Sequence, residues 1–383
     1  MIHIVKRGSI RWYYAMLIRG AALILALLVC ALLIRLLTGK EPVDVYVTIF
    51  NASFSEPRLT WQMLYSLSIL LCVSLALLPA FRMRFWNLGG EGQILAGGLA
   101  TAAVMISMKN LVKDGVIPHE LMILAMIIAG VLAGAVWAVI PAIFKAKWNT
   151  NETLFTLMMN YVAIQLVNYF GFIWESRKGS GTIGIINQKD IVPGTKSDRI
   201  GWLPNIQWDP NKFADKYLLT IIVAVVLTIT IAVYLNYSKH GYEISVVGES
   251  QRTARYVGIK VEKVIIRTMI LSGALCGLVG VLLVAGMKHT LNAGITEGRG
   301  FTAVMVAWLA KLNPVWMALT SFLLVFLEKG SGDLSSSNEL KLDQSFSDIM
   351  TGIILFFIIG AEFFVNYKIC FWHFSGKEEL KRV

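Results

Sequence analysis

Residues 120–143 read ELMILAMIIAGVLAGAVWAVIPAI, an apolar run with no charged residue after its first position. A helix needs about 20 mainly apolar residues to cross the hydrocarbon core of a bilayer, and this run is long enough. It places Gly130, Gly134 and Ala138 four residues apart. Small residues at that spacing let helix backbones approach closely in lipid, although glycine is also simply common in membrane helices. The run 264–287 carries a second such stripe, formed by Gly273, Gly277 and Gly280.

Similar apolar runs follow one another along the chain. Those long enough to cross a bilayer lie near 14–37, 60–80, 88–108, 120–143, 153–174, 217–236, 264–287 and 346–367. Two shorter runs, 300–311 and 315–328, are separated by Asn313-Pro314, where proline stops a helix because it lacks a donor and restricts its predecessor. This shorter pair forms either two spans or a re-entrant break. We therefore predict an all-α, polytopic membrane protein of about ten helices, organised as one domain over residues 1–383.

The composition supports the same class. The chain is 56% hydrophobic and 15% charged, whereas soluble domains are typically about 25% charged. A soluble protein with a large core would need shorter apolar elements than these. The net charge of +11 does not indicate nucleic-acid binding, because the Lys and Arg residues lie in the gaps between apolar runs, as the positive-inside rule requires. We expect a multi-pass protein of the bacterial inner (plasma) membrane.

The distribution of basic residues predicts an orientation. If the N-terminus is cytoplasmic, the short interior loops receive Arg82, Arg84, Lys145, Lys147, the cluster 239–267, Lys311 and the basic C-terminus. The irregular loop 175–216 then lies outside the cell. An even number of spans places the C-terminus in the cytoplasm too. The basic start followed by the run 20–37 resembles a secretion signal, but the run is too long and no cleavage pattern follows, so we keep it as a span.

Enzyme and metal motifs are absent from the sequence. There is no G-x-x-x-x-G-K-[ST] phosphate loop and no cytoplasmic segment long enough for a nucleotide-binding domain. The cysteines show no paired spacing, and the histidines are scattered without metal or catalytic spacing. They are His3, His119, His240, His289 and His373. We predict no catalytic residue, no metal site and no cofactor in this chain, so any ATP must be hydrolysed elsewhere.

Neutral polar residues are the candidates for a translocation path. Glu152, Thr156 and Asn160 step by four and share one helix face, which must point into the bundle because lipid cannot satisfy polar groups. Asn87 and Gln93 are further candidates beside glycines. These side chains either line a path for an uncharged solute or form hydrogen bonds between helices. An ion-coupled carrier would instead bury carboxylates near the bilayer centre, and the carboxylates here fall near span ends.

Two glycine-rich segments share a spacing. Residues 87–92 read NLGGEG, and residues 292–298 carry Asn-Ala-Gly followed by Glu297-Gly298. Each follows a long span and precedes a helix start, and the predicted topology puts them on opposite sides of the membrane. This favours an inverted-topology repeat over a chance agreement.

The segment 241–263 is the most informative cytoplasmic loop. Ser250 is a candidate N-cap, residues 251–257 can form a helix, and Gly258 can end it. A short bounded helix between two spans favours a docking element for a cytosolic partner. The alternative is a solvated basic connector.

Three stretches resemble motifs of one family. Residues 85–93 (FWNLGGEGQ) are similar to F-N-I-G-x-E-G-Q, residues 151–161 (NETLFTLMMNY) to N-E-x-x-x-T-L-M-x-N-Y, and residues 247–259 (VGESQRTARYVGI) to V-G-x-N-x-x-A-A-R-Y-x-G-I. These motifs belong to the ABC-importer permeases for branched-chain amino acids, ribose and nucleosides, most closely to the nucleoside or simple-sugar branch. Trp86, Gly90, Ser250 and Thr253 depart from the patterns.

The resemblance implies a type II importer fold with two permease subunits around one pathway. It also implies a separate ATPase subunit that binds ATP and Mg²⁺, and an extracytoplasmic solute-binding protein, which can be a lipoprotein. The nucleoside branch commonly pairs two different permeases, so a heterodimer is favoured. The solute is expected to be a nucleoside, with a simple sugar as the alternative; an ion-coupled carrier and a scaffold without transport are the alternatives from other classes. The ATPase-coupling residues implied by the resemblance are Gly248, Glu249, Ser250, Arg252, Arg255, Tyr256 and Gly258.

Overall fold

The computed structural model describes residues 2–6, 11–39, 41–176, 179–180, 182–195, 198–207, 214–336 and 344–371. Their contacts form two compact units, one made of Met1–Ser53 with Phe326–Val383 and the other of Phe54–Val325. The loops predicted at 175–216 and 241–263 both fall within the second unit.

The first unit joins the two ends of the chain. Its elements are β1 (Ile2–Lys6), α1 (Trp12–Thr38), most of α2 (Pro42–Phe54), α14 (Gln344–Asn366) and β2 (Tyr367–Phe371). Helix α1 packs on α14 through a stripe of buried residues that includes Ala26, Cys30 and Ile34. Strands β1 and β2 pair antiparallel, with Ile2 opposite Phe371 and Lys6 opposite Tyr367. Residues 2–6 and 367–371 therefore lie side by side.

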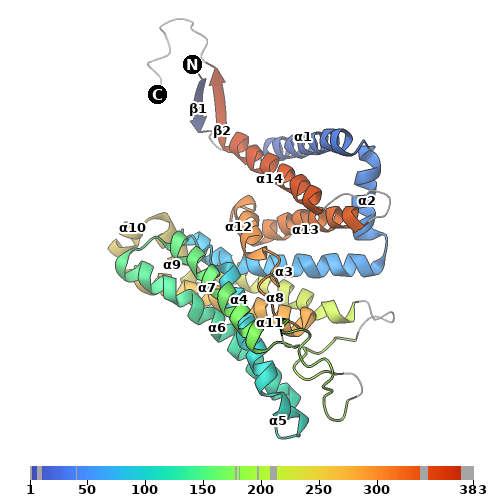
Figure 1. The fold of residues 1–383 in the computed structure, drawn as a ribbon. Helices are drawn as coiled ribbons and strands as arrows, with labels where there is room; N and C mark the ends of the chain where they lie inside the picture. The colour runs from blue at the N-terminus through green and yellow to red at the C-terminus, as the bar shows by residue number, and fades with distance from the viewer. Residues whose placement is uncertain are drawn as a thin grey trace, which may run out of the picture. The chain divides into compact units, whose positions relative to one another are not determined.

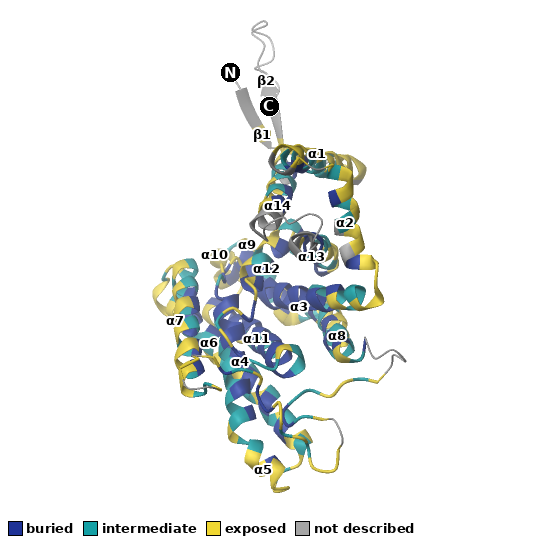
Figure 2. Ribbon diagram, turned by 45° about the vertical axis from the view of Figure 1, so that its right-hand side comes forward, coloured by how far each residue is buried: buried dark blue, intermediate teal, exposed yellow. Residues whose placement is uncertain are grey.

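The second unit contains the remaining helices (Figure 1). They are α3 (Pro57–Arg82), α4 (Gly90–Ser107), α5 (Lys109–Lys113), α6 (His119–Trp148), α7 (Glu152–Ile173), α8 (Asp215–Tyr237), α9 (Lys239–Glu249), α10 (Gln251–Tyr256), α11 (Val261–Val281) and α12 (Arg299–Leu309). A π-helix, Leu282–Lys288, continues α11, and α13 (Pro314–Ser336) runs from this unit into the first one. The core lies along α3, α4 and α11, whose ribbons are mostly buried (Figure 2).

The predicted all-α membrane fold is confirmed. Every predicted apolar run forms a helix, and the only strands in the described ranges are the short pair β1 and β2. Six helices in the described part of the chain are long and apolar enough to cross a membrane. They are α1, α3, α6, α7, α8, and α11 together with its π-helical extension. Helices α2, α5 and α9 were not predicted, because they are short and lie between the apolar runs.

Helix α12 corrects one reading of the run 300–311. It has 11 residues and is only about 16 Å long, roughly half the hydrocarbon core, so it cannot cross a bilayer alone. Arg299 at its start donates to the Ser66 carbonyl inside α3 at 3.3 Å. Trp308 near its end stacks on Trp86, just past the end of α3, with ring centroids 4.9 Å apart. A turn-rich stretch, 289–298, precedes this half-length helix, which lies beside α3.

Helices α6, α11 and α4 meet along a seam of glycines. A Cβ added to Gly134 would collide with the Gly273 carbonyl oxygen, and one on Gly277 would collide with the Gly130 carbonyl oxygen. Gly97 of α4 approaches the Cα of Gly277 with equally little space. The stripes predicted from sequence are thus packing faces. We call Gly97, Gly130, Gly134, Gly273, Gly277 and Gly280 the glycine seam.

The long loop after α7 is folded over the ends of α4 and the π-helix. The Asn187 amide donates to the carbonyls of Met105 and Ile200, at 3.0 Å each. Trp202 stacks on His289 with ring centroids 3.5 Å apart. Burial lowers the pKa of His289 to about 4, so this ring is neutral near pH 7. The described part of the loop, predicted to be irregular, has no helix or extended ladder but is held by specific contacts.

Candidate functional site

The connection between α3 and α4 is built around Asn87. Its Oδ1 accepts from the Gly89 amide and from Gln93 Nε2, both at 3.1 Å. Its Nδ2 donates to Ser272 Oγ of α11 at 3.2 Å. Asn87, Gln93 and Ser272 are all fully buried. These bonds give a break between two membrane helices the polar partners that lipid cannot supply.

Helix α7 holds the same break from its other side. Asn160 accepts from the Gly92 amide and donates to the Leu88 carbonyl, both at 2.8 Å. The Leu88 amide donates to Thr156 Oγ1 at 3.2 Å, and that hydroxyl lies 2.8 Å from the Glu152 carbonyl to which it donates. We call Asn87, Gln93, Thr156, Asn160 and Ser272 the buried polar network. Its groups bond to each other and to backbone, a geometry that favours the hydrogen-bonding reading over a solute-lining one.

Glu152 stands apart from this network. Its Oε2 lies 2.9 Å from Lys145 Nζ at the end of α6. Asn151 caps α7 by accepting from the Leu154 amide at 3.2 Å. The predicted helix face therefore divides: Thr156 and Asn160 join Asn87 and Gln93, while the Glu152 carboxylate joins the α6–α7 corner. Among the described residues no group of three or more His, Cys, Asp or Glu could hold a metal ion.

Glu91 is a functional candidate that sequence reasoning missed. Its carboxylate accepts from the Thr296 hydroxyl and, at 2.9 Å, from the Gly300 amide in the first turn of α12. A carboxylate at a helix N-terminus is stabilised by the unpaired amides and by the helix dipole. The signal was present, because each glycine-rich segment carries a Glu-Gly pair.

This contact corrects the placement of the two glycine-rich segments. They were expected on opposite sides of the membrane, yet Glu91 of one bonds directly to Thr296, in the other. The stretch 289–298 leads from the end of the π-helix to the start of α12, where it meets the start of α4. The inverted repeat itself stays a prediction.

The second candidate region is the segment α9–α10. Ser250 Oγ accepts from the Thr253 amide at 3.2 Å, as its predicted N-cap role requires. Gly258 has φ +84°, the left-handed conformation that suits glycine beyond a helix end. Ala254 is buried beneath α10. Tyr256 and Val257 are 92% and 58% exposed. The short helix predicted at 251–257 thus exists, bounded at both ends and with an aromatic side chain in solvent.

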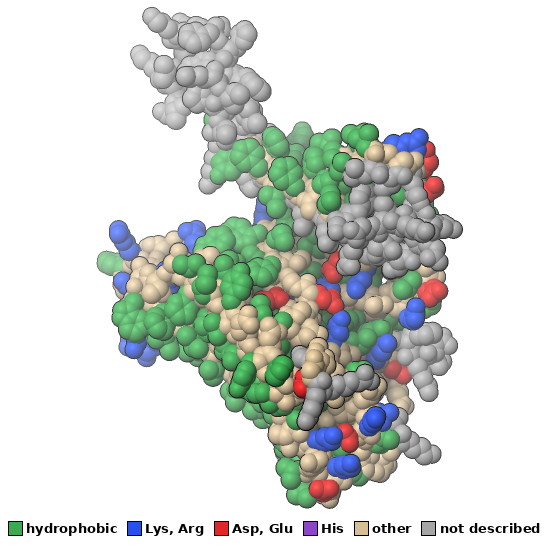
Figure 3. All heavy atoms as spheres, viewed as in Figure 1, with side chains coloured by type: hydrophobic (Ala, Val, Ile, Leu, Met, Phe, Trp, Pro, Cys, Tyr) green, Lys and Arg blue, Asp and Glu red, His purple; other side chains and the backbone are tan. Residues whose placement is uncertain are grey.

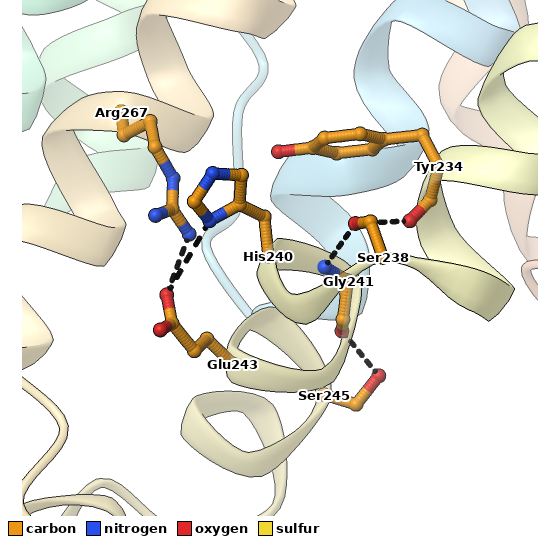
Figure 4. A network of polar contacts seen from close by, with 7 residues as sticks. All are labelled: Tyr234, Ser238, His240, Gly241, Glu243, Ser245 and Arg267. Atoms are coloured by element: carbon orange, nitrogen blue, oxygen red, sulfur yellow. Dashed lines mark hydrogen bonds and ion pairs between the residues drawn. The ribbon is translucent and has the colours of Figure 1, made fainter.

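Helix α9 is fixed to its neighbours by a polar network (Figure 4). Glu243 accepts from Arg267 of α11 at 2.9 Å, and His240 Nδ1 lies 3.7 Å away from the same carboxylate oxygen. Burial by itself raises the pKa of Glu243, but the hydrogen bond and charge of Arg267, with His240, bring it below the usual value. Ser238 Oγ accepts from the Gly241 amide at 2.9 Å and caps α9 after α8.

The far end of α9 touches the end of α3. A Cβ on Gly248 would collide with the Arg82 carbonyl oxygen, so only glycine permits this approach. Arg82 Nη1 in turn donates to the Leu235 carbonyl of α8 at 3.2 Å. Helix α9 is thus held by α3, α8 and α11 together, and the end of α3 leads directly into the buried polar network.

Comparison with known proteins covers most of the chain. Residues 59–359 match the family described as branched-chain amino acid transport system / permease component. The guanosine ABC transporter permease protein NupP of Bacillus subtilis is 30% identical over 89% of this chain and 92% of its own length. The nucleoside ABC transporter permease protein NupB of Lactococcus lactis is 25% identical, over 85% and 86%.

A sugar permease is similarly related. The glucose ABC transporter permease protein TsgB13 of Haloferax volcanii is 26% identical over 86% of this chain and 83% of its own length. No solved structure matches the chain. Since the family match covers most of the sequence and agrees with the helical fold, this chain belongs to the permease components of the branched-chain amino acid transport system family.

Proposed function

We propose that the chain is the membrane-spanning subunit of an ATP-driven ABC importer and that it translocates nucleosides by alternating access. The relatives named for guanosine and nucleoside transport, one of them 30% identical over nearly its full length, support the substrate class. The glucose permease of Haloferax volcanii keeps a simple sugar as the second candidate. An ion-coupled carrier is disfavoured by the family match.

A separate ATPase, which binds ATP and Mg²⁺, docks on α10 in this proposal. The observation that carries it is a capped helix with an exposed tip, Tyr256 and Val257, seated on a base that is bonded to α3, α8 and α11. Exposed aromatic residues are enriched in the centres of protein interfaces. The rigid base would convert a push on α10 into movement of membrane helices.

The coupling route then runs through the contacts described above. Closure of the ATPase moves α9–α10, the Gly248–Arg82 contact passes the displacement to α3, and the buried polar network keeps the α3–α4 break intact while it moves. Glu91 links that break to α12 through Thr296 and Gly300. In this scheme Asn87, Gln93, Thr156 and Asn160 transmit movement, and Glu152 ties α7 to α6.

The remaining parts of the complex follow from the family and from charge. We place the α9–α10 segment and both chain ends in the cytoplasm, where the clustered Lys and Arg residues belong. The loop after α7 then faces outward, toward a solute-binding protein that is anchored as a lipoprotein. A second, related permease completes the pathway as a heterodimer.

The docking role is tested by removing the exposed tip of α10. We expect Tyr256→Ala with Val257→Ser to abolish co-purification of the ATPase and uptake, while the chain still inserts in the membrane. Tyr169→Ala is the matched control, because Tyr169 is also exposed but lies near the C-terminal end of α7 and not on α10. Full ATPase recovery with the double variant would refute docking on α10.

The substrate is tested by uptake in cells that express the complete complex. We expect labelled guanosine or another nucleoside to accumulate in a vanadate-sensitive manner, with excess nucleoside competing and excess ribose or glucose not competing. Competition by the sugars alone would select the sugar alternative. Vanadate-insensitive uptake by this chain alone would overturn the importer assignment.

A further inference from the structure

A recess with a volume of about 620 Å³ opens where α6 ends and α10 and α11 begin. It is lined mainly by charged and polar side chains: Lys145, Lys147, Asn149, Arg252, Arg255 and Glu262. Figure 3 shows Lys and Arg side chains gathered around the α10 end of this unit, beside hydrophobic ones. The recess belongs wholly to the second unit.

The recess carries an excess of positive charge that the chain does not neutralise. Four of its side chains are cationic and one is anionic. Lys145 pairs with Glu152 at 2.9 Å, but Lys147, Arg252 and Arg255 have no ion pair with any residue that the structure describes. In the same unit Lys109 pairs with Asp190, Lys288 with Glu297 and Arg267 with Glu243. The recess thus gathers three cations that form no ion pair with any described residue, and together they can bind an external anion.

The position of the recess identifies the kind of anion. Helices α6 and α11 are both long and apolar enough to span a membrane, and the recess lies at their ends, at the depth of lipid headgroups. Beside it, Phe144 packs against Trp148 and against Phe155, with ring centroids 5.1 and 4.9 Å apart. Phe144 and Trp148 are 39% and 62% exposed. Tryptophan side chains such as Trp148 are enriched at the membrane–water interface.

The recess is distinct from the exposed tip of α10. Tyr256 and Val257 do not line it, whereas Gln251, Arg252 and Arg255 do. Helix α10 therefore presents basic side chains to the recess and an aromatic tip to solvent. A ligand in the recess and a protein on the tip can bind at once.

We propose that this recess binds the headgroup of an anionic phospholipid. The phosphate lies among Lys147, Arg252 and Arg255, and the acyl chains run along the exposed rings of Phe144 and Trp148. Basic pockets between membrane helices bind anionic headgroups in this way, because the cations compensate the phosphate while the tails stay in the bilayer. The lipid then lies under the segment that couples to ATP hydrolysis and ties that segment to the membrane surface. This inference does not depend on the transported solute.

The test uses the full chain in its purified complex. Lipid binding is measured by native mass spectrometry after exchange into detergent with phosphatidylglycerol, diphosphatidylglycerol or phosphatidylcholine. We expect selective retention of the two anionic lipids. Arg252→Gln with Arg255→Gln should weaken that binding about thirtyfold, since each basic residue near an anionic surface contributes about 1 kcal/mol. The matched control is Lys239→Gln with Lys263→Gln, which removes two charges from the same end of the unit but outside the recess.

Three results would overturn the proposal. Equal retention of phosphatidylcholine would show that the phosphate charge is not recognised. Displacement of the lipid by millimolar inorganic phosphate would assign the recess to a free anion. Loss of ATPase co-purification in the Arg252/Arg255 variant, with lipid retention unchanged, would assign these cations to the ATPase. If Tyr256→Ala with Val257→Ser leaves lipid binding intact but loses the ATPase, the two surfaces are separate, as expected.

Discussion

The glycine seam and the recess beside α10 belong to one helical unit but differ in how closely their helices approach one another. In the seam, α4, α6 and α11 approach so closely that an added methyl group would strike a backbone atom of the neighbouring helix. At the recess the ends of α6 and α11 part and leave a charged hollow. Lipid offers no hydrophobic drive for helix association, so close backbone packing must hold the seam. The recess contributes little to folding and is free to bind.

The largest effect is expected from breaking the seam. Gly134→Val places its Cβ against the Gly273 carbonyl and Gly277 and adds two methyl groups beyond it. Overpacking of this kind costs about 3 kcal/mol or more where the backbone cannot yield. We expect little monodisperse protein by size-exclusion chromatography. Gly20→Ala is the control, because nothing lies near its added methyl group. A normal yield of the Gly134 variant would show that α6 and α11 can separate.

The next largest effect is expected from a change in the buried polar network. Asn160→Leu leaves the Gly92 amide and the Leu88 carbonyl without partners, and each buried unsatisfied group costs about 1–3 kcal/mol. We expect thermal stability and uptake to fall together. Thr156→Val should show the same pattern at smaller size. Loss of uptake with unchanged melting temperature would instead place Asn160 in the solute path.

The pH response should differ between the two ends of the second unit. His289 has a pKa of about 4 in the folded protein, against about 6.5 for an unperturbed histidine. The unfolded form thus binds a proton first as pH falls, and stability contributed by the neutral ring is lost between about pH 6.5 and 4. After correction for the pH dependence of intrinsic exchange, we expect hydrogen-exchange protection of the loop 182–195 to fall as the pH decreases through this window. The corrected protection in His289→Gln should not change over the same window.

A weaker response is expected where Glu243 meets Arg267. The lowered pKa of Glu243 means that its stabilising contribution is complete above about pH 4.3 and is lost as the pH falls through the folded value. Glu243→Gln removes the carboxylate charge and should act at neutral pH as protonation of Glu243 does at low pH. The folded protein should lose less than about 1 kcal/mol of stability, because the ion pair is partly exposed. The melting temperature of wild type and variant should converge at low pH.

The smallest effect is expected in the recess. Ala146→Leu adds bulk at a position that lines the hollow, and substitutions away from packed features usually stay within about 0.5 kcal/mol. The melting temperature should not change, in contrast to Gly134→Val. A large destabilisation would mean that the recess closes in the folded protein.

The sequence predicted some of these regions better than others. The seam was predicted, because Gly130, Gly134, Gly273 and Gly277 recur at helical spacing and that spacing alone defines a face. Ser250 and Gly258 were predicted for a similar reason, since caps are local features. The shared helix face of Thr156 and Asn160 was also predicted. The sequence did not show whether these side chains bond to backbone groups or contact the solute.

The missed features depend on contacts between distant segments. Hydropathy gives the length of an apolar run but not the depth at which it begins, so the half-length α12 was not separated from a full span. The bond from Glu91 to Thr296 joins residues 205 positions apart, and no local pattern encodes it. The recess arises from the ends of three helices, and its charges had been assigned only to topology and to coupling.

The pairing of β1 with β2 bears on how this protein can be handled. Because Ile2 lies opposite Phe371, we expect the halves of a split fluorescent protein, fused to the two ends, to reassemble without any partner chain. A bulky fusion at one end will crowd the other. Affinity tags are therefore better placed at one end than at both.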